Sequence, residues 1–251
     1  MIVSVRNLRK VYPLGKVFVE AVKGVSFDIE KGEFVSISGP SGSGKSTILN
    51  MLGLIDTPSS GELSIDGESI YTEQDFSSLS KRANKKVKVP KKLDRKITTL
   101  RHEYLGFIFQ SFNLIPVLDV YENVEFPLLF SKRKETKKET TEWIDYLIER
   151  VGLTDWIHHR SNELSGGQRQ RVAIARALVT KPSLVLADEP TANLDSKTGY
   201  EVLELMKEVN REFGTTFIFS THDEKIVTMT THRIKLLDGC IIENTKVNHE
   251  A

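Results

Sequence analysis

Residues 39–46 read Gly-Pro-Ser-Gly-Ser-Gly-Lys-Ser, a spacing that fits the phosphate-binding pattern G-x-x-x-x-G-K-S. Glycines let the backbone wrap closely around a phosphate, and N–H groups at the start of the following helix supply positive potential. In such a loop Lys45 reaches the terminal phosphates of a nucleoside triphosphate, and Ser46 holds Mg²⁺. A glycine-rich turn without a ligand is the alternative, and it is disfavoured because a strand is predicted before the loop and a helix after it. The candidate nucleotide-binding residues are therefore Gly39, Pro40, Ser41, Gly42, Ser43, Gly44, Lys45, Ser46 and Thr47.

A second candidate group follows the apolar run at residues 183–187, which has the length and composition of a central parallel strand. Asp188 at the end of this strand is placed beside the phosphate-binding loop, where it can orient Mg²⁺ through water. Glu189 points in a different direction and is the candidate for polarising an attacking water. Neighbouring carboxylates at a strand end also occur for structural reasons, so this interpretation depends on the loop.

Residues 162–168 read Asn-Glu-Leu-Ser-Gly-Gly-Gln at the start of a predicted helix. Ser165, Gly166, Gly167 and Gln168 resemble the LSGGQ signature of ATP-binding-cassette (ABC) ATPases. The resemblance implies that these residues form a second anion site, which belongs to the ATP held by an opposing protomer. Two copies of the chain would then sandwich two ATP molecules in a head-to-tail dimer, which disfavours a monomeric kinase or GTPase.

Four further residues match ABC elements in the family's order. The resemblance implies that Tyr12 stacks on adenine and that Gln110 contacts Mg²⁺ and senses the partner. It implies that Asp195 lies near the dimer seam and that His222 contacts the γ-phosphate. Local strand packing of Tyr12 and a structural role for His222 are the plain alternatives. The expected catalytic residues are thus Glu189, His222, Lys45 and Gln110, and the expected metal ligands are Ser46, Gln110 and Asp188.

The elements that must position these residues alternate between strand and helix, which indicates an α/β fold around a parallel sheet. Hairpin turns are expected at Asp66-Gly67 and Asp238-Gly239. The resemblance implies a P-loop NTPase (RecA-like) core with a parallel sheet, an antiparallel β subdomain and a helical signature subdomain. Expected strands cover residues 1–10, 17–22, 25–29, 33–38, 106–109, 183–187 and 216–220, and expected helices cover 45–54, 135–151, 166–179 and 197–212.

We predict one ABC ATPase domain over residues 1–243, with a helical subdomain at about 111–170 and a C-terminal tail at 244–251. A basic insertion is expected at about 77–98. Residues 81–101 contain ten Lys or Arg and one acidic residue. One interpretation is a solvated surface insertion or mobile loop. The other is a patch that meets anionic lipid headgroups or an acidic partner.

Composition restricts the class of protein further. A formal net charge of +1 argues against general coating of nucleic acid, and none is expected as a partner. The single cysteine, Cys240, excludes an intramolecular disulfide and fits a reducing cytosol. No apolar run reaches the roughly 18–20 residues that a membrane helix needs, so any work at a membrane requires docking onto another protein.

Residues 106–116 and 122–124 resemble the lipoprotein-releasing, macrolide-export and cell-division type of ABC ATPase. The resemblance implies a subunit on the cytoplasmic face of the cell membrane that powers a separate permease for export or mechanotransmission. The basic insertion is longer than in that type, and Ser161 stands where proline is common. Alternatives are an import ATPase, and a soluble ABC ATPase acting on nucleic acid or ribosomes. The latter is disfavoured by the single cassette and the lack of a long coiled coil.

The permease contact is expected near residues 111–124. Phe112, Leu114 and Ile115 are apolar and are candidates to line a groove for a short helix. Core packing is the alternative for all three residues.

Overall fold

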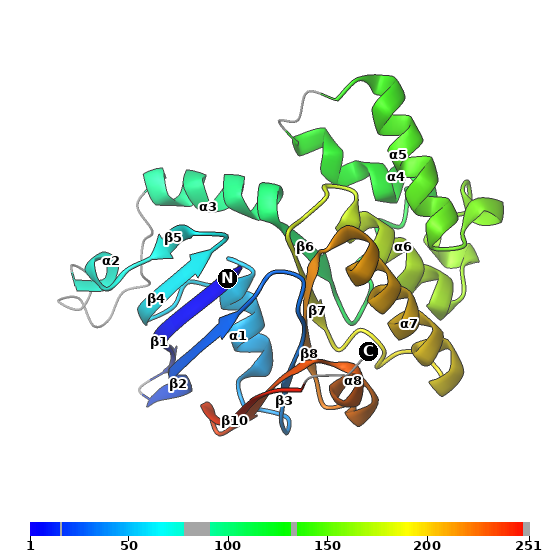
Figure 1. The fold of residues 1–251 in the computed structure, drawn as a ribbon. Coiled ribbons are helices and arrows are strands. Elements are labelled where there is room, and N and C mark those ends of the chain that lie inside the picture. Colours follow the sequence, from blue (N-terminus) through cyan, green and yellow to red (C-terminus); the bar gives the residue numbers. More distant parts are fainter. Residues whose placement is uncertain (16, 78–90, 132–134, 248–251) are drawn as a thin grey trace.

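A six-stranded sheet carries the candidate residues of the loop and of the strand ends (Figure 1). The computed structural model describes residues 1–15, 17–77, 91–131 and 135–247. The strand order is β10-β9-β3-β8-β7-β6, with parallel pairing from β9 to β6 and an antiparallel edge at β10. The strands are β3 (Phe34–Ser38), β6 (Leu105–Ile108), β7 (Leu184–Asp188), β8 (Thr216–Thr221), β9 (His232–Leu237) and β10 (Cys240–Lys246).

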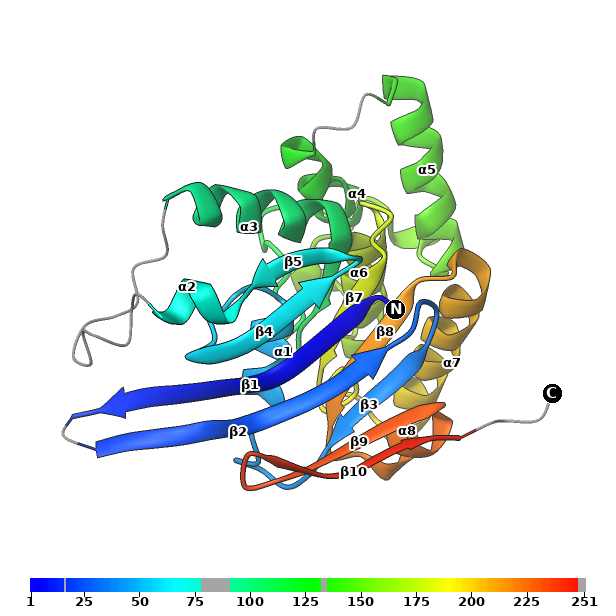
Figure 2. The same cartoon turned by 60° about the vertical axis from the view of Figure 1, so that its left-hand side comes forward.

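An antiparallel sheet with the order β2-β1-β4-β5 lies beside the first sheet, and its β1–β2 ribbon extends well beyond the body of the protein (Figure 2). Residues 17–22 and 25–29, which we predicted as two strands, belong to one strand with register shifts. The register shifts interrupt the alternation of apolar residues, so the sequence reads as two short apolar runs with a break between them. The strands are β1 (Val3–Leu14), β2 (Val17–Ile29), β4 (Ser60–Ile65) and β5 (Glu68–Tyr71).

The helices pack on the sheets and form a separate group at the right of Figure 1, where α4, α5 and α6 lie. The four helices predicted from the sequence are confirmed, with ends that differ by at most two residues. The α-helices are α1 (Lys45–Leu52), α2 (Glu73–Ser77), α3 (Lys91–Tyr104), α4 (Val120–Glu125), α5 (Lys137–Arg150), α6 (Gly166–Leu178), α7 (Ser196–Phe213) and α8 (Glu224–Met229). Short 3₁₀ turns are η1 (Phe126–Phe130), η2 (Thr154–Trp156) and η3 (Ser161–Glu163).

Two apolar clusters hold these layers together. One lies between the antiparallel sheet, α1 and α3, and the other lies between α4–α7 and the opposite face of the parallel sheet. Residues Leu184, Val185, Leu186 and Ala187 of β7 are fully buried and alternate between the two clusters. A strand covered on both faces explains the continuous apolar run in the sequence. The mixed sheet, antiparallel sheet and helical region confirm the predicted fold class.

The basic stretch is partly a helix, so the loop interpretation is wrong for residues 91–101. Helix α3 buries Ile97 and Leu100 in the first cluster, and Lys96 pairs with Glu68 on β5. The high density of Lys and Arg masked an apolar spacing of i, i+3. Residues 78–90, which include Lys85 and Lys86, lie outside the described residues.

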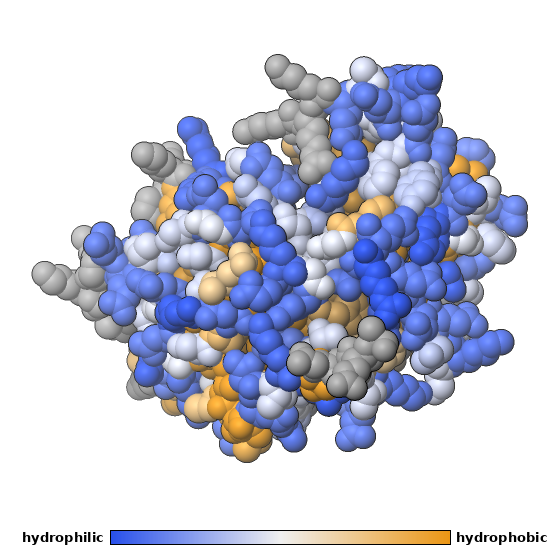
Figure 3. Space-filling view, in the orientation of Figure 1, coloured by the Kyte–Doolittle hydropathy of each residue, from blue (hydrophilic) through white to orange (hydrophobic). Residues whose placement is uncertain are grey.

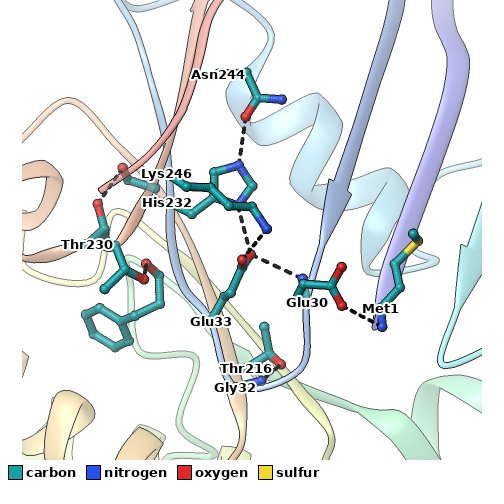
Figure 4. Close-up of polar contacts among 12 residues, drawn as sticks. Met1, Glu30, Gly32, Glu33, Thr216, Thr230, His232, Asn244 and Lys246 are labelled. Atoms are coloured by element: carbon teal, nitrogen blue, oxygen red, sulfur yellow. Dashed lines mark hydrogen bonds and ion pairs between the residues drawn. The ribbon is translucent and has the colours of Figure 1, made fainter. Parts of the chain in front are cut away.

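The end of β10 is held by a polar cluster around the buried ring of His232 (Figure 4). His232 Nδ1 lies 2.8 Å from Glu33 Oε2, and its Nε2 lies 2.7 Å from Asn244 Oδ1. Lys246 Nζ lies 2.5 Å from the other oxygen of Glu33. Burial raises the pKa of Glu33, but Lys246 and His232 outweigh it, so the pKa lies below its usual value. Residues 244–246, which we expected in a tail, therefore belong to a strand.

The face shown in Figure 3 is mainly hydrophilic, with apolar side chains gathered over the β9–β10 hairpin, where Leu237 and Ile242 are exposed. In the described parts of the chain, no helix combines the length and apolar character that crossing a bilayer requires.

Candidate nucleotide-binding and hydrolysis site

The glycine-rich loop joins β3 to α1, as predicted. Gly39 has a φ of +147°, and a Cβ at this position would collide with the carbonyl oxygen of Leu236. Only glycine fits such a close approach of two backbones. Lys45 is largely buried, and its Nζ donates to the carbonyl oxygens of Gly39 at 2.8 Å and Pro40 at 3.0 Å. The loop thus closes around the Lys45 ammonium group, which we expect to contact the phosphates of a bound nucleotide.

Ser46 and Asp188, two predicted metal ligands, lie together at one edge of the sheet. The Ser46 hydroxyl, on the first turn of α1, donates to Asp188 Oδ1 at 3.2 Å at the end of β7. Gln110 follows β6, which pairs in parallel with β7, so its backbone reaches the same edge. Hydroxyl, carboxylate and amide oxygens suit a hard cation such as Mg²⁺.

Glu189 and His222 contact each other directly across the ends of β7 and β8. The distance from His222 Nδ1 to Glu189 Oε1 is 2.7 Å, and Thr221 Oγ1 donates to Glu189 Oε2 at 3.3 Å. The Glu189 side chain is 16% exposed while that of His222 is 70% exposed, so the carboxylate is largely shielded from solvent and the imidazole is largely open to it. Glu189 has a φ of +43°, and its N–H donates to Ser220 O at 2.8 Å. A left-handed backbone is disfavoured for Glu, and such strain is typical of functional positions.

Tyr12 is half-buried on β1 and belongs to a polar group that sequence reasoning missed. Its hydroxyl donates to Asp56 Oδ2 at 2.6 Å, and Lys10 Nζ lies 2.5 Å from Asp56 Oδ1. Lys10 also lies 4.8 Å from the centre of the Tyr12 ring. Burial, followed by the bond to Asp56, raises the pKa of Tyr12 to about 12. No spacing in the sequence signals the contact with Asp56, because that residue lies in an irregular segment 44 positions away.

The signature residues begin α6, as predicted, and are held by bonds among themselves. Ser165 Oγ accepts from the N–H of Gln168 at 3.3 Å, and Gln168 Oε1 accepts from the N–H of Ser165 at 2.8 Å. This reciprocal capping box leaves Ser165 exposed at the start of the helix, with Gly166 half-buried and Gly167 buried behind it. Among the hydrogen bonds of the described residues, none joins these residues to the glycine-rich loop of the same chain. Ser161, our noted departure, begins the short turn η3 before the signature.

Asp195 begins α7 and acts there as a helix cap. Its Oδ1 accepts from the N–H groups of Lys197 and Thr198, both at 3.1 Å. Hydrogen bonds from Thr198 hold the pKa of this carboxyl below its usual value. The nearby Asn193 donates from Nδ2 to the carbonyl oxygen of Gln110 at 2.8 Å, which links this loop to the end of β6.

Phe112 is buried, Leu114 packs against the second apolar cluster, and Ile115 is half-buried, so the core-packing alternative describes Leu114. None of these three predicted groove residues lines the cavity described next. A cavity of about 270 Å³ opens beside them, between α3, β6, η1 and α6. It is lined by Thr98, Arg101, His102, Leu105, Gly106, Phe107, Phe109, Asn113, Pro127, Arg176, Ala177 and Thr180.

Comparison with known proteins places the chain in a family. Residues 22–192 match the family described as ABC transporter. An uncharacterized ABC transporter ATP-binding protein of Thermotoga maritima is 46% identical over 92% of this chain and 90% of its own length. The lipoprotein-releasing system ATP-binding protein LolD of Francisella tularensis is 42% identical over 95% of each chain.

A solved structure agrees with this placement over nearly the whole chain. The dimeric post-hydrolysis state of the ATP-binding cassette MJ0796, bound to ADP and Pi, superposes with a TM-score of 0.82 at 39% identity. The match covers 99% of this chain and 100% of that one. The resemblance predicted from the signature is therefore confirmed, and the chain belongs to the ABC transporter family as an ATP-binding subunit that hydrolyses ATP.

Proposed function

We propose that this subunit works on the cytoplasmic face of the cell membrane and powers a separate permease for export or mechanotransmission. The observation that carries the proposal is the cavity beside the Gln110 loop, which faces outward between α3 and the helical region. A separate permease needs a docking site on this subunit, and the cavity is our candidate for it. Similarity to a lipoprotein-releasing ATP-binding protein supports the export direction over import.

The lining of the cavity combines apolar and cationic side chains, which suits a short amphipathic segment of a partner. Phe107, Phe109 and Pro127 supply apolar surface, and Arg101 and Arg176 supply cations at the wall. The neighbouring turn η1 exposes Leu129 and Phe130, with the Phe130 ring centre 5.8 Å from that of His102. Exposed apolar residues next to a partly apolar cavity are typical of a protein contact.

ATP binds in the glycine-rich loop in this proposal, and the contacts around the loop support the binding and catalytic roles that follow. Lys45 exchanges its bonds to Gly39 and Pro40 for phosphate oxygens, while Tyr12 offers its ring to adenine. Glu189 orients and polarises the attacking water, and His222 donates toward the γ-phosphate. Ser46, Asp188 and Gln110 would hold Mg²⁺, which offsets phosphate charge when bound.

The functional unit is a head-to-tail dimer in which Ser165 and Gly167 of one protomer close over the ATP of the other. Two features support this. The capped first turn of α6 presents N–H groups to an anion. It also shares no hydrogen bond with the glycine-rich loop of its own chain among the described residues. The similar cassette MJ0796 is a dimer.

The test is affinity capture of the Glu189→Gln variant with ATP and Mg²⁺ from mildly solubilised native membranes. Lys45→Ala, which cannot hold the phosphates, is the matched control. Recovery of a few-span permease with a large extracytoplasmic domain only with Glu189→Gln supports the proposal. A many-span permease with a solute-binding protein indicates import instead. If only soluble proteins or nucleic acid are recovered, the proposed work with a permease is rejected, while the assignment as an ATPase is retained.

A further inference from the structure

The loop that follows Gln110 has an unusual backbone. Phe112 has a φ of +61° and Asn113 has a φ of +49°, so two successive residues other than glycine are left-handed. Asn tolerates this region, but a bulky residue such as Phe is strongly disfavoured there. Something outside the loop must therefore hold this conformation.

The holding group is the guanidinium of Arg176, near the end of α6. Its Nη1 donates to Asn113 O at 2.5 Å and its Nη2 donates to Phe112 O at 2.6 Å. The two bonds use the planar fork of the guanidinium on two successive carbonyl groups, a geometry that a single ammonium cannot reproduce. Burial lowers the pKa of Arg176 to about 10, so the group remains cationic at neutral pH.

Two further contacts fasten the same loop. The Arg169 guanidinium, also on α6, lies 5.2 Å from the centre of the Phe112 ring. Asn193 donates to the carbonyl oxygen of Gln110 at 2.8 Å. Arg176 and Arg169 belong to the helix that begins at the signature residue Ser165, so signature and Gln110 loop are joined through one rigid element.

We propose that Arg176 is a positioning residue for ATP hydrolysis: its two bonds to the Phe112 and Asn113 carbonyl groups fix the loop that carries Gln110. Arg176 acts through the backbone of the loop that carries Gln110, so the inference rests on the role proposed for Gln110. Because Arg176 also lines the cavity beside α3, a segment that docks there contacts the guanidinium that holds the loop.

The test compares Arg176→Met and Arg176→Lys with Arg171→Met in the full chain. Arg171 is a matched control on α6, because its Nη1 also donates to a carbonyl, Val151 O, but away from the Gln110 loop. Arg176→Met lowers kcat by about tenfold with ATP affinity unchanged, and Arg176→Lys gives a smaller loss. Hydrogen exchange of the amides at residues 110–114 speeds up in Arg176→Met and not in Arg171→Met.

A double-mutant cycle with Gln110→Ala separates positioning from general support. If Arg176 acts through Gln110, adding Arg176→Met to Gln110→Ala lowers kcat by less than about twofold more. The inference is overturned if the two substitutions lower kcat by factors that multiply. It is also overturned if hydrogen exchange at residues 110–114 is unchanged in Arg176→Met, or if Arg171→Met lowers kcat equally. If Gln110→Ala alone leaves kcat intact, the role of Gln110 fails as well. If Gln110→Ala lowers kcat while Arg176→Met does not, the role of Gln110 stands and only the inference about Arg176 is lost.

Discussion

His222 Nδ1 lies 2.7 Å from Oε1 of Glu189, so the two side chains proposed for catalysis are hydrogen-bonded to each other. The carboxylate can only accept, so the imidazole donates from Nδ1. This contact leaves the Nε2 atom of the exposed ring directed away from Glu189. With Nδ1 donating to Glu189, Nε2 donates to a phosphate oxygen only when both ring nitrogens carry a proton, and otherwise it accepts.

Glu189→Gln keeps the shape of the site and removes the base. We expect ATP binding to persist and turnover to fall by about 100-fold or more, the usual contribution of a general base. The protein should then accumulate as an ATP-bound dimer. Phosphate release and size-exclusion chromatography with ATP measure both effects. Rapid turnover by this variant would contradict the assigned role.

His222→Ala removes the donor and uncovers the carboxylate. Loss of one donor aimed at developing charge lowers kcat by about 100-fold. Because the two groups contact each other, the effect should shrink strongly when His222→Ala is added to Glu189→Gln. Additive losses in that cycle would mean that the contact seen here has no part in hydrolysis.

Tyr12→Phe retains the ring and removes the bond to Asp56, whereas Tyr12→Ala removes both. We expect Tyr12→Phe to retain ATP affinity and Tyr12→Ala to weaken it, measured by titration with a fluorescent ATP analogue. Equal weakening by the two substitutions would assign the effect to the hydroxyl instead of the ring.

Tyr12 also makes stability depend on alkaline pH. Its folded pKa of about 12 is raised above the ordinary value of 10.0, so the native state retains the phenol proton more tightly. The resulting stabilisation is complete below pH 10 and is lost as pH rises to 12. Urea unfolding across that range should show a smaller decline for Tyr12→Phe than for the unaltered chain. An identical decline in both would refute the contribution of Tyr12.

Leu100→Ala tests the helix found within the basic stretch. Leu100 is 8% exposed and packs in the first apolar cluster, so its truncation should destabilise the protein by about 2–4 kcal/mol. The exposed Arg95 on the same helix is the control, and Arg95→Ala should change the unfolding free energy by less than about 0.5 kcal/mol. Equal effects in urea unfolding would show that α3 does not pack as described.

Sequence reasoning predicted those parts of the fold whose signal is local. The loop at residues 39–46 and the strand before Asp188 can each be predicted from residues adjacent in the sequence. The structure has both where they were expected. Helix α3 was missed because charge outweighed its few buried positions. Phe112 was a candidate for the groove because it is apolar, while its burial, its left-handed backbone and the bond from Arg176 are visible only in three dimensions.

The contacts of the site residues were beyond prediction for the same reason. Asp56 and Arg176 reach their partners from 44 and 64 positions away, and no periodicity reports such pairings. The strand end before Asp188 supplied Glu189 and the family resemblance supplied His222, but neither predicted the bond between them.

The Lys45 ammonium, bonded to the carbonyl groups of Gly39 and Pro40, ties the end of the glycine-rich loop to its start. The curvature of the loop is therefore fixed by contacts within the chain. An ammonium group held in this way has already lost most of its side-chain freedom, so little further entropy is lost when it bonds to a phosphate oxygen.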